Sequence, residues 1–202
     1  IGSGQVLSCP YSWEKAELVV QEMADQLALR LVEKRLVAGQ LVLTVGYDRE
    51  NLRNPDRENP YGGEISSDRY GRAVPKHGHG TVNLEQPASS GRILMEAAKE
   101  LYERIVDRRL LIRRIDLTAG RVETEETVSG REVFRQMELF ADPEKEKRDA
   151  EQKSELERER KLQEAMLGIK KKYGKNAILK GMNLQEGATA AQRNRQIGGH
   201  RA

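Results

Sequence analysis

The 202-residue chain has one cysteine, few aromatic residues and no long apolar run. Because Cys9 has no second cysteine to pair with, an internal disulfide and a CxxC metal or redox site are excluded. No apolar run approaches the ~18 residues that a membrane-spanning helix needs, and no signal peptide is visible. These absences predict a cytoplasmic protein with no membrane partner. The chain begins at Ile1, among residues that already predict a strand, so we interpret it as a piece of a longer protein.

The sequence also lacks the usual catalytic patterns. No G-x-x-x-x-G-K-[ST] phosphate loop is present, and no nucleophile stands beside a base. The acidic residues between positions 49 and 73 form no convincing metal-binding set. His77 and His79 share one strand face, but no third ligand lies near them in the sequence. We therefore predict no catalytic residue, no metal site and no cofactor in this segment.

Charge is abundant but unevenly distributed. One third of the residues are charged, and the whole chain carries +3. Eight Lys and Arg against one Glu give +7 to residues 168–202, which leaves −4 for residues 1–167. A basic end of this kind suits either a polyanion such as nucleic acid or a solvated tail without a partner.

Hydrophobic periodicity predicts two helices and four strands in the first 126 residues. Apolar residues recur at helical spacing after Ser12, and again after Ser89 or Ser90, two candidate N-caps. Alternating segments at 4–9, 40–48, 74–84 and 110–123 predict strands. Residues 49–73 carry Asn, Asp, Gly and Pro without apolar period, which predicts a long loop or an extended hairpin tip. The order predicts an α+β, ferredoxin-like βαββαβ domain with two helices on one face of a four-stranded sheet.

The second face of such a sheet is left open, and alternation selects the side chains that it carries. The predicted set comprises Thr44, His77, His79, Thr81, Asn83, Ile112, Arg114, Asp116 and Thr118. Adjacent Arg113 and Arg114 should point to opposite faces, with Arg113 near the strand end at the rim. A polar face of this composition suits a phosphate backbone. We therefore predict DNA contacts from Lys76, His77, His79, Thr81, Arg113 and Arg114. The alternatives are plain solvent exposure for the histidines, and for the arginines a solvated pair bonded to Asp116 or Glu123.

Three further segments follow the predicted domain of residues 1–126. Residues 127–142 form a polar linker that contains an apolar cluster, residues 143–174 a charged helix, and residues 175–202 a basic, flexible tail. Asp142 and Pro143 are typical of a helix start. An apolar stripe of Leu162, Met166, Ile169 and Tyr173 is expected near the end of the charged helix.

The linker cluster, "QMELF", has the composition of a peptide ligand. Gln136 can donate and accept hydrogen bonds at a polar rim, and Met137 fills an adaptable apolar site. Leu139 and Phe140 supply paired anchors for a deep pocket. The pentapeptide resembles the binding motif for the bacterial sliding clamp. The alternative is that the apolar side chains fold back onto their own domain.

Several segments together resemble the C-terminal part of bacterial Y-family translesion DNA polymerases of the UmuC/DinB (ImpB/MucB/SamB) kind. They are "GQVLSCPYSWEKAELVVQEMADQLALRL", "HGTVNL", "LLIRRIDLTAG" and "QMELF", and the tail resembles that of a Gram-positive branch. The resemblance implies that residues 1–126 are a little-finger domain that binds the primer–template backbone. It also implies that the linker binds the sliding clamp and that the parent protein is a nucleotidyltransferase acting in SOS-type DNA repair. Its Mg²⁺-binding carboxylates would lie in a palm domain outside this chain.

Two features depart from this resemblance, and two other functions remain open. The −4 charge of residues 1–167 means that DNA binding would rest on a local face, and the loop at 49–73 has no role in it. The parent could instead be a catalytically inactive, polymerase-like adaptor for mutagenesis. The domain could also be a ferredoxin-like RNA-binding module, although such sheets display exposed aromatic residues. A recombinase filament is a candidate partner of the basic tail.

Overall fold

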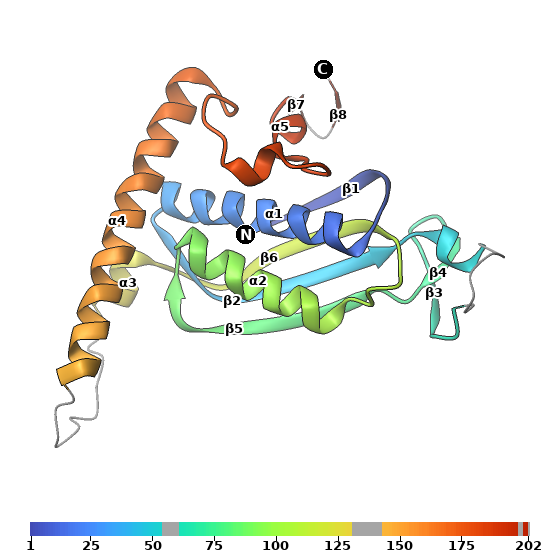
Figure 1. Ribbon diagram of the computed structural model, residues 1–202, viewed down its shortest axis with the longest axis horizontal. Coiled ribbons are helices and arrows are strands. Elements are labelled where there is room, and N and C mark those ends of the chain that lie inside the picture. Colours follow the sequence, from blue (N-terminus) through green and yellow to red (C-terminus); the bar gives the residue numbers. More distant parts are fainter. Residues whose placement is uncertain (54–60, 131–142, 198–199, 202) are drawn as a thin grey trace.

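The computed structural model describes residues 1–53, 61–130, 143–197 and 200–201. Its centre is a four-stranded antiparallel sheet in the order β1-β6-β2-β5 (Figure 1). The strands are β1 (Gly2–Tyr11), β2 (Leu36–Tyr47), β5 (Gly78–Ala88) and β6 (Ile112–Thr124). β6 lies between β1 and β2, and β2 lies between β5 and β6, so both halves are split β-α-β units. The predicted α+β, ferredoxin-like βαββαβ arrangement is confirmed.

Two helices cover one face of this sheet, α1 (Trp13–Glu33) and α2 (Gly91–Ile105). Each begins at a serine whose hydroxyl accepts a hydrogen bond from the first turn. Ser12 accepts from the amide of Lys15 at 3.5 Å, and Ser90 from that of Ile93 at 3.2 Å. Such caps satisfy amides that have no partner within the helix. The predicted helix starts are therefore confirmed, with Ser90 rather than Ser89 as the second cap.

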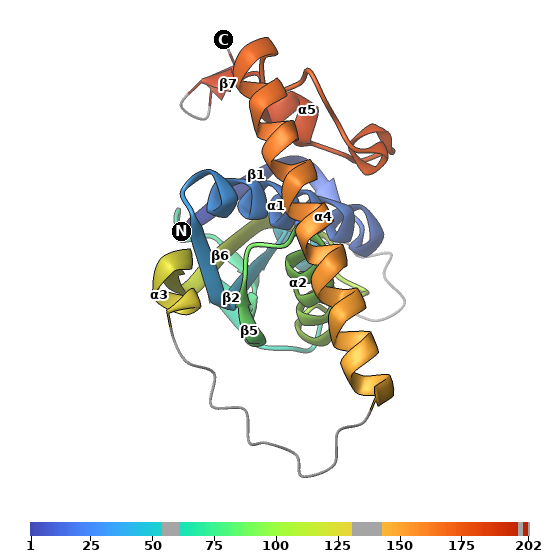
Figure 2. The ribbon, with the colours of Figure 1, turned by 90° about the vertical axis from the view of Figure 1, so that its left-hand side faces the viewer.

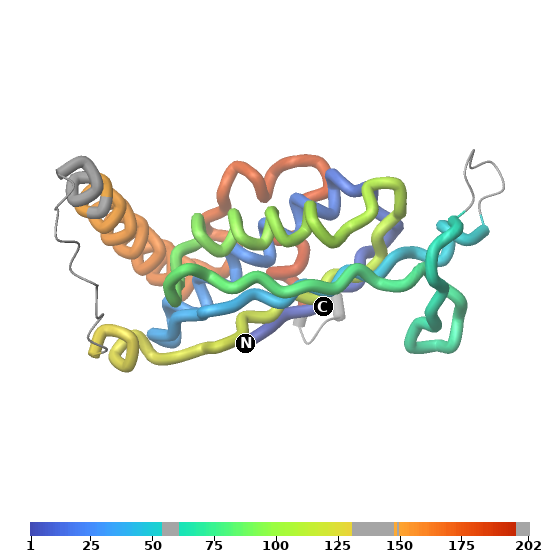
Figure 3. The backbone as a smooth tube through the Cα atoms, turned by 90° about the horizontal axis from the view of Figure 1, so that it is seen from below, coloured from blue at the N-terminus to red at the C-terminus, as the bar shows by residue number. Residues whose placement is uncertain are grey.

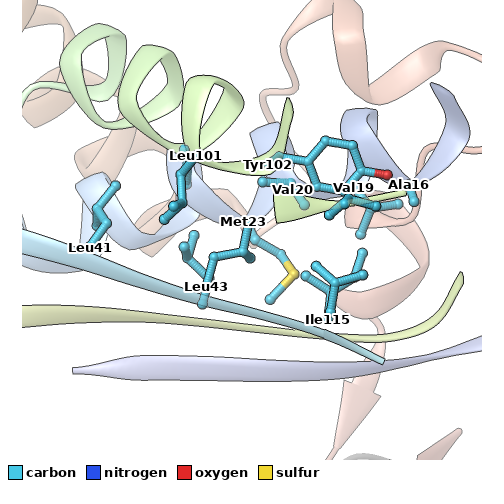
Figure 4. Packing of buried hydrophobic residues seen from close by; sticks show 14 of the residues in the cluster. Ala16, Val19, Val20, Met23, Leu41, Leu43, Leu101, Tyr102 and Ile115 are labelled. Atoms are coloured by element: carbon cyan, nitrogen blue, oxygen red, sulfur yellow. The ribbon is translucent and has the colours of Figure 1, made fainter. Parts of the chain in front are cut away.

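The core lies between the helices and the sheet (Figure 4). Met23 of α1 and Leu101 of α2 are fully buried above Leu43 and Ile115 of the sheet. Alternate residues of β2 are buried, as predicted: Leu41, Leu43, Val45 and Tyr47. The hydroxyl of buried Tyr102 donates to the carbonyl of Trp13 at 2.8 Å, so this polar group is satisfied inside the core. This bond links α2 to the first residue of α1 within the helical layer.

Ile112 departs from the predicted alternation. It is fully buried, whereas the sequence pattern placed it on the open face. The register of β6 shifts against both neighbours here, between Gly46 and Tyr47 of β2 and between Val6 and Tyr11 of β1. A bulge adds a residue and reverses the in–out alternation beyond it. Arg113 and Arg114 therefore both lie between buried Ile112 and buried Ile115.

The segment between β2 and β5 forms a small hairpin of its own beyond the end of the sheet. It contains the 3-10 helix η1 (Arg49–Leu52) and the paired strands β3 (Ile65–Ser67) and β4 (Ala73–Pro75). Buried Asn51 fixes its base, because its side chain exchanges two 2.8 Å hydrogen bonds with the backbone of Leu111. In Figure 3 the hairpin extends past the sheet toward the side opposite the helices. The predicted extended hairpin tip is thus present in its described part.

The C-terminal part follows β6, and most of it packs beside α1 of the helical layer, whereas its first helix contacts β6. Its elements are α3 (Glu125–Ser129), α4 (Pro143–Tyr173), η2 (Gly181–Leu184), α5 (Ala190–Arg193), β7 (Gln196–Ile197) and β8 (His200–Arg201). α4 passes the ends of α1 and α2 (Figure 2). Of the predicted apolar stripe, Met166 is buried, whereas Leu162 is 58% and Tyr173 66% exposed. Polar groups supply the rest of the contact: Gln163 is buried, Arg160 bonds Glu125, and Glu159 bonds Ser90.

The segment after α4 was predicted to be flexible, and its described part instead runs beside α1. Glu22 of α1 is 1% exposed, and its Oε2 accepts hydrogen bonds from the amides of Thr189 at 2.7 Å and Ala190 at 3.1 Å. Its Oε1 accepts from the Asn183 amide group at 2.8 Å. Lys180 donates to Asp25, one turn further along α1, at 2.5 Å. Two acidic residues on α1 therefore hold a segment that is rich in donors, a relation that charge counting cannot reveal.

Candidate nucleic-acid interface

The open face of the sheet is built from rows of side chains that strand register brings together. One row runs across all four strands through Gly4, Asp116, Thr44 and His79. The next joins Gly2, Thr118, Val42 and Thr81. Neither helices nor the described part of the C-terminal segment cover this face in Figure 3. The face is therefore polar, shallow and accessible.

The predicted residues of β5 and the preceding turn are found on this face. His77, His79 and Thr81 are exposed, as is Asn83. His79 Nδ1 lies 2.8 Å from the hydroxyl of Thr44. A parallel bond joins the Gln40 and Asn83 side chains at 3.0 Å. These cross-strand bonds orient the polar groups, which leaves the outer nitrogen of His79 for a ligand.

Arg114 is exposed on the same face but is already paired. Its guanidinium donates to both carboxylate oxygens of Asp116, at 2.6 and 3.2 Å. This hydrogen bond is the main reason that the pKa of Arg114 is raised. A phosphate that binds Arg114 must share it with Asp116 or displace that carboxylate. The alternative that Arg114 forms a solvated pair with Asp116 therefore describes this residue when no DNA is bound.

Arg113 and Lys76 lie at the edge of the interface. Arg113 is 3.8 Å from a carboxylate oxygen of Asp48 and lies at the rim, as predicted. It does not face away from Arg114, since both residues line one groove. Lys76 follows β4 and pairs with Glu64 at 2.7 Å. These two cations thus belong to the hairpin end of the sheet rather than to its central rows.

Small residues on β1 keep the interface flat. A side chain added at Gly4 would collide with the carboxylate of Asp116, and one at Gly2 with the hydroxyl of Thr118. The large apolar side chain of Val6, on the same strand, is 65% exposed. A flat polar surface admits a bulky backbone more easily than a deep pocket does. This geometry fits contacts to phosphates and sugars.

A groove adjoins the sheet at its hairpin end, and sequence reasoning missed most of it. The groove has a volume of about 620 Å³ and lies between the β3–β4 hairpin and the ends of β1, β2 and β6. Arg69, Tyr70 and Arg72 line its hairpin side, with Arg113 and Arg114 opposite. The "DRYGR" turn was the available signal, because Asp and Gly at these positions are typical of a tight hairpin turn. Because the surrounding loop shows no apolar period, the sequence does not indicate what this turn contacts.

The other predicted sites differ in what the structure shows of them. No group of three or more metal-binding side chains occurs among the described residues. No described helix is long and apolar enough to span a bilayer. In the described part of the chain, the open face carries no exposed Phe, Tyr or Trp, which disfavours the RNA-binding alternative. The pentapeptide residues Gln136, Met137, Leu139 and Phe140 lie outside the described residues.

Comparison with known proteins places this geometry in a family context. The model of the impB/mucB/samB family C-terminal domain matches residues 1–132. The match covers the four-stranded sheet, both covering helices, the hairpin and α3. No curated protein matches the chain.

Proposed function

Because this chain belongs to the impB/mucB/samB family, whose C-terminal domain it contains, we propose that it binds the primer–template backbone for a lesion-bypass DNA polymerase. This family is that of the UmuC/DinB-type Y-family polymerases, so a place in DNA repair follows from the membership. The observation that carries the proposal is the open sheet face. Its exposed groups are His77, His79, Thr81 and Arg114, and both helices and the described C-terminal segment lie elsewhere.

Charge and hydrogen bonding support contacts to the DNA backbone. Arg114 and the rim residue Arg113 supply cations, and the hydroxyl of Thr81 and the ring of His79 supply neutral hydrogen-bonding groups. Such groups position a protein on a duplex without reading its bases. An error-prone polymerase benefits from this, because the sequence beneath the domain changes with every step. The parent polymerase would supply the catalytic carboxylates and Mg²⁺, and the linker would supply a tether.

The DNA-binding part is tested with Arg114→Ala in the full 202-residue chain. Fluorescence anisotropy with a labelled duplex should show weaker binding and a log–log salt slope reduced by about one. Lys99→Ala is the matched control, since Lys99 lies on α2 in the helical layer and pairs with Glu17 at 3.5 Å. This variant also removes one positive charge, but from a position far from the open face of the sheet. Equal effects of the two variants would contradict a binding surface on the open face.

Asp116→Asn should change DNA affinity in the opposite direction from Arg114→Ala. The substitution removes the carboxylate that occupies Arg114, while its amide still fits beside the guanidinium. Duplex binding should therefore become tighter, with a steeper salt dependence, because Arg114 is released for phosphate. A loss of affinity in this variant would show that Asp116 itself supports DNA binding.

The clamp-binding part of the proposal rests on the pentapeptide at residues 136–140. Tethering would raise the effective concentration of the polymerase at a primer end. Calorimetric titration of the chain into a bacterial sliding clamp should give a Kd of about 1 μM, a free energy of roughly −8 kcal/mol. Leu139→Ala/Phe140→Ala should abolish it. Leu162→Ala/Ile169→Ala is the control, because these side chains are exposed apolar residues on α4.

The adaptor alternative shares both predictions, because it differs only in the missing N-terminal part. Paired acidic residues on strands of the upstream sequence would assign the parent as an active enzyme. Their absence would assign it as an adaptor. Failure of clamp binding would leave the DNA-binding proposal intact, since the two depend on different residues.

A further inference from the structure

The groove beside the sheet is bounded by a hairpin of defined shape. Within the turn, Asp68 accepts hydrogen bonds from the amides of Tyr70 at 2.8 Å and Arg72 at 2.9 Å. Its second oxygen accepts from Arg72 Nε at 2.7 Å, which lowers the pKa of Asp68. Gly71 completes the turn with a φ of +74°, a conformation that favours glycine. The turn is thus internally bonded, and the exposed side chains of Arg69 and Tyr70 are not needed to maintain it.

Tyr70 is the exposed aromatic residue of this hairpin. Its side chain is 78% exposed, although it is large and apolar over most of its surface. The Arg72 guanidinium lies 5.0 Å from the ring centroid, which steadies the ring by a cation–π contact. Across the groove lies Val6, another exposed apolar side chain. Together they give the groove an aromatic ring on which a nucleobase can stack and an aliphatic side chain for apolar contact.

Five arginines and four carboxylates line the groove around these apolar surfaces. Arg49 and Arg69 line the groove and form no hydrogen bond or ion pair with other described residues. Among the described residues, the Arg113 guanidinium has one ion-pair partner, Asp48, at the long distance of 3.8 Å. Guanidinium groups near an exposed ring match the pattern of single-strand binding sites, in which bases stack and phosphates pair with cations. The volume of about 620 Å³ also lies within the range of small-ligand sites, roughly 300–1,000 Å³.

A duplex cannot use this combination of groups. Its bases are stacked on each other, so no base face is available to Tyr70, and the phosphates alone would reach the arginines. An unpaired nucleotide presents a free base face as well as a phosphate. The groove is continuous with the open face through Arg114 and Asp116, which line both. A strand leaving a duplex on the sheet would therefore enter the groove directly.

We propose that this groove binds an unpaired DNA segment next to the duplex, with Tyr70 stacked on a base and Arg69 on a phosphate. The site rests on the proposed function, because it extends the same DNA-binding surface. In a primer–template, the unpaired segment is the 5′ overhang of the template strand. The hairpin, which the sequence left without a role, thereby becomes the part of the domain that distinguishes the unpaired template from the product duplex.

The experiment compares three labelled DNAs in anisotropy titrations with the 202-residue chain. They are a blunt duplex, the same duplex with a short 5′ overhang, and the same duplex with a 3′ overhang. The 5′ overhang should bind about five- to tenfold more tightly than the blunt duplex, the effect of one stacked base. Tyr70→Ala should remove this preference and leave blunt-duplex binding unchanged, whereas Tyr70→Phe, which keeps the ring, should retain it. Arg69→Ala should reduce overhang binding and its salt slope.

Tyr173→Ala is the control, because Tyr173 is also an exposed tyrosine, 66% exposed, and lies on α4 outside the groove. Equal binding of blunt and overhang DNA, or a preference that survives Tyr70→Ala, would overturn the groove site while leaving duplex binding in place. Failure to bind any of the three DNAs would overturn the proposed function together with it. If both overhangs raise the affinity equally and Tyr70→Ala removes this increase, the groove is a single-strand site. That result would contradict its selectivity for the 5′ template end.

Discussion

Glu22 is the residue on which attachment of the C-terminal segment to α1 depends most. It is 1% exposed, and its carboxylate accepts four hydrogen bonds from residues 183–190. Three of these reach one oxygen, from the amides of Thr189 and Ala190 and the hydroxyl of Thr189. Removing the carboxylate leaves two amides without a partner in a buried place. The segment should therefore leave α1 when Glu22 is replaced.

The size of the effect follows from the burial of these groups. Removing one partner from a buried charged network costs about 3–5 kcal/mol, mostly because the remaining groups stay unsatisfied. If the segment undocks, its amides are hydrated again. The stability lost in the variant therefore cannot exceed the free energy with which the segment docks on α1. Sequence-distant Lys180 and Asp25 form one further contact that resists release. Glu22→Ala should therefore open residues 175–196 locally without unfolding the sheet.

Native-state hydrogen exchange measures this opening directly. Protection of the Thr189 and Ala190 amides should fall by at least about 100-fold in Glu22→Ala, which corresponds to roughly 3 kcal/mol. Glu22→Gln should have a similar effect, since the amide nitrogen cannot accept hydrogen bonds while the shape is preserved. Glu186→Ala is the control, because this exposed residue contacts α1 only through the Lys15 ion pair. Unchanged protection in both Glu22 variants would refute the reasoning.

Other expectations concern the core and the docking of α4. Burial raises the pKa of Tyr102, so the folded protein keeps a proton that the unfolded chain loses above about pH 10. The free energy of unfolding should therefore decline as the pH rises above that value. Tyr102→Phe should make this decline shallower by about 1.4 kcal/mol per pH unit, measured by denaturant titrations at several pH values. Arg160→Ala removes the contacts to Glu125 and Ser89 and should speed proteolysis within residues 150–173, whereas Leu162→Ala should not. Leu101→Ala should lower the free energy of unfolding by about 2–5 kcal/mol, measured by urea titration, because Leu101 is fully buried.

The sequence predicts the domain well wherever its pattern is local. Alternation along β2 and helical spacing along α1 depend on burial of one face, and both are found in the structure. The position of Ile112 could not be predicted in this way. The bulge that buries it arises from pairing of β6 with two neighbours, each about 65 to 100 residues away in sequence. No local pattern records such a register shift.

The C-terminal segment shows a second limit of sequence reasoning. Its Lys, Asn and Thr side chains are typical of a solvated tail, and Glu22 and Asp25 are typical of an exposed helix face. Each set suggests solvent exposure on its own, but together they satisfy one another in a buried contact. The groove was missed for a similar reason, because the turn at Asp68–Arg72 and the arginines of β6 meet only in the folded domain.

The arrangement of the domain links its two proposed contacts. The pentapeptide segment begins after α3 and ends at α4, and both helices lie at the end of the domain opposite the hairpin (Figure 1). α4, which follows the pentapeptide in sequence, is bonded to the domain through Arg160 and Glu159. A duplex on the open face would then have α3 and α4, which flank the proposed clamp-binding pentapeptide in sequence, at one end and the single-strand groove at the other. A clamp slides on the duplex behind a polymerase, whereas the unpaired template lies ahead of it. One surface can therefore hold both parts of a primer–template in the order in which synthesis uses them, and this order requires the groove to prefer the 5′ overhang.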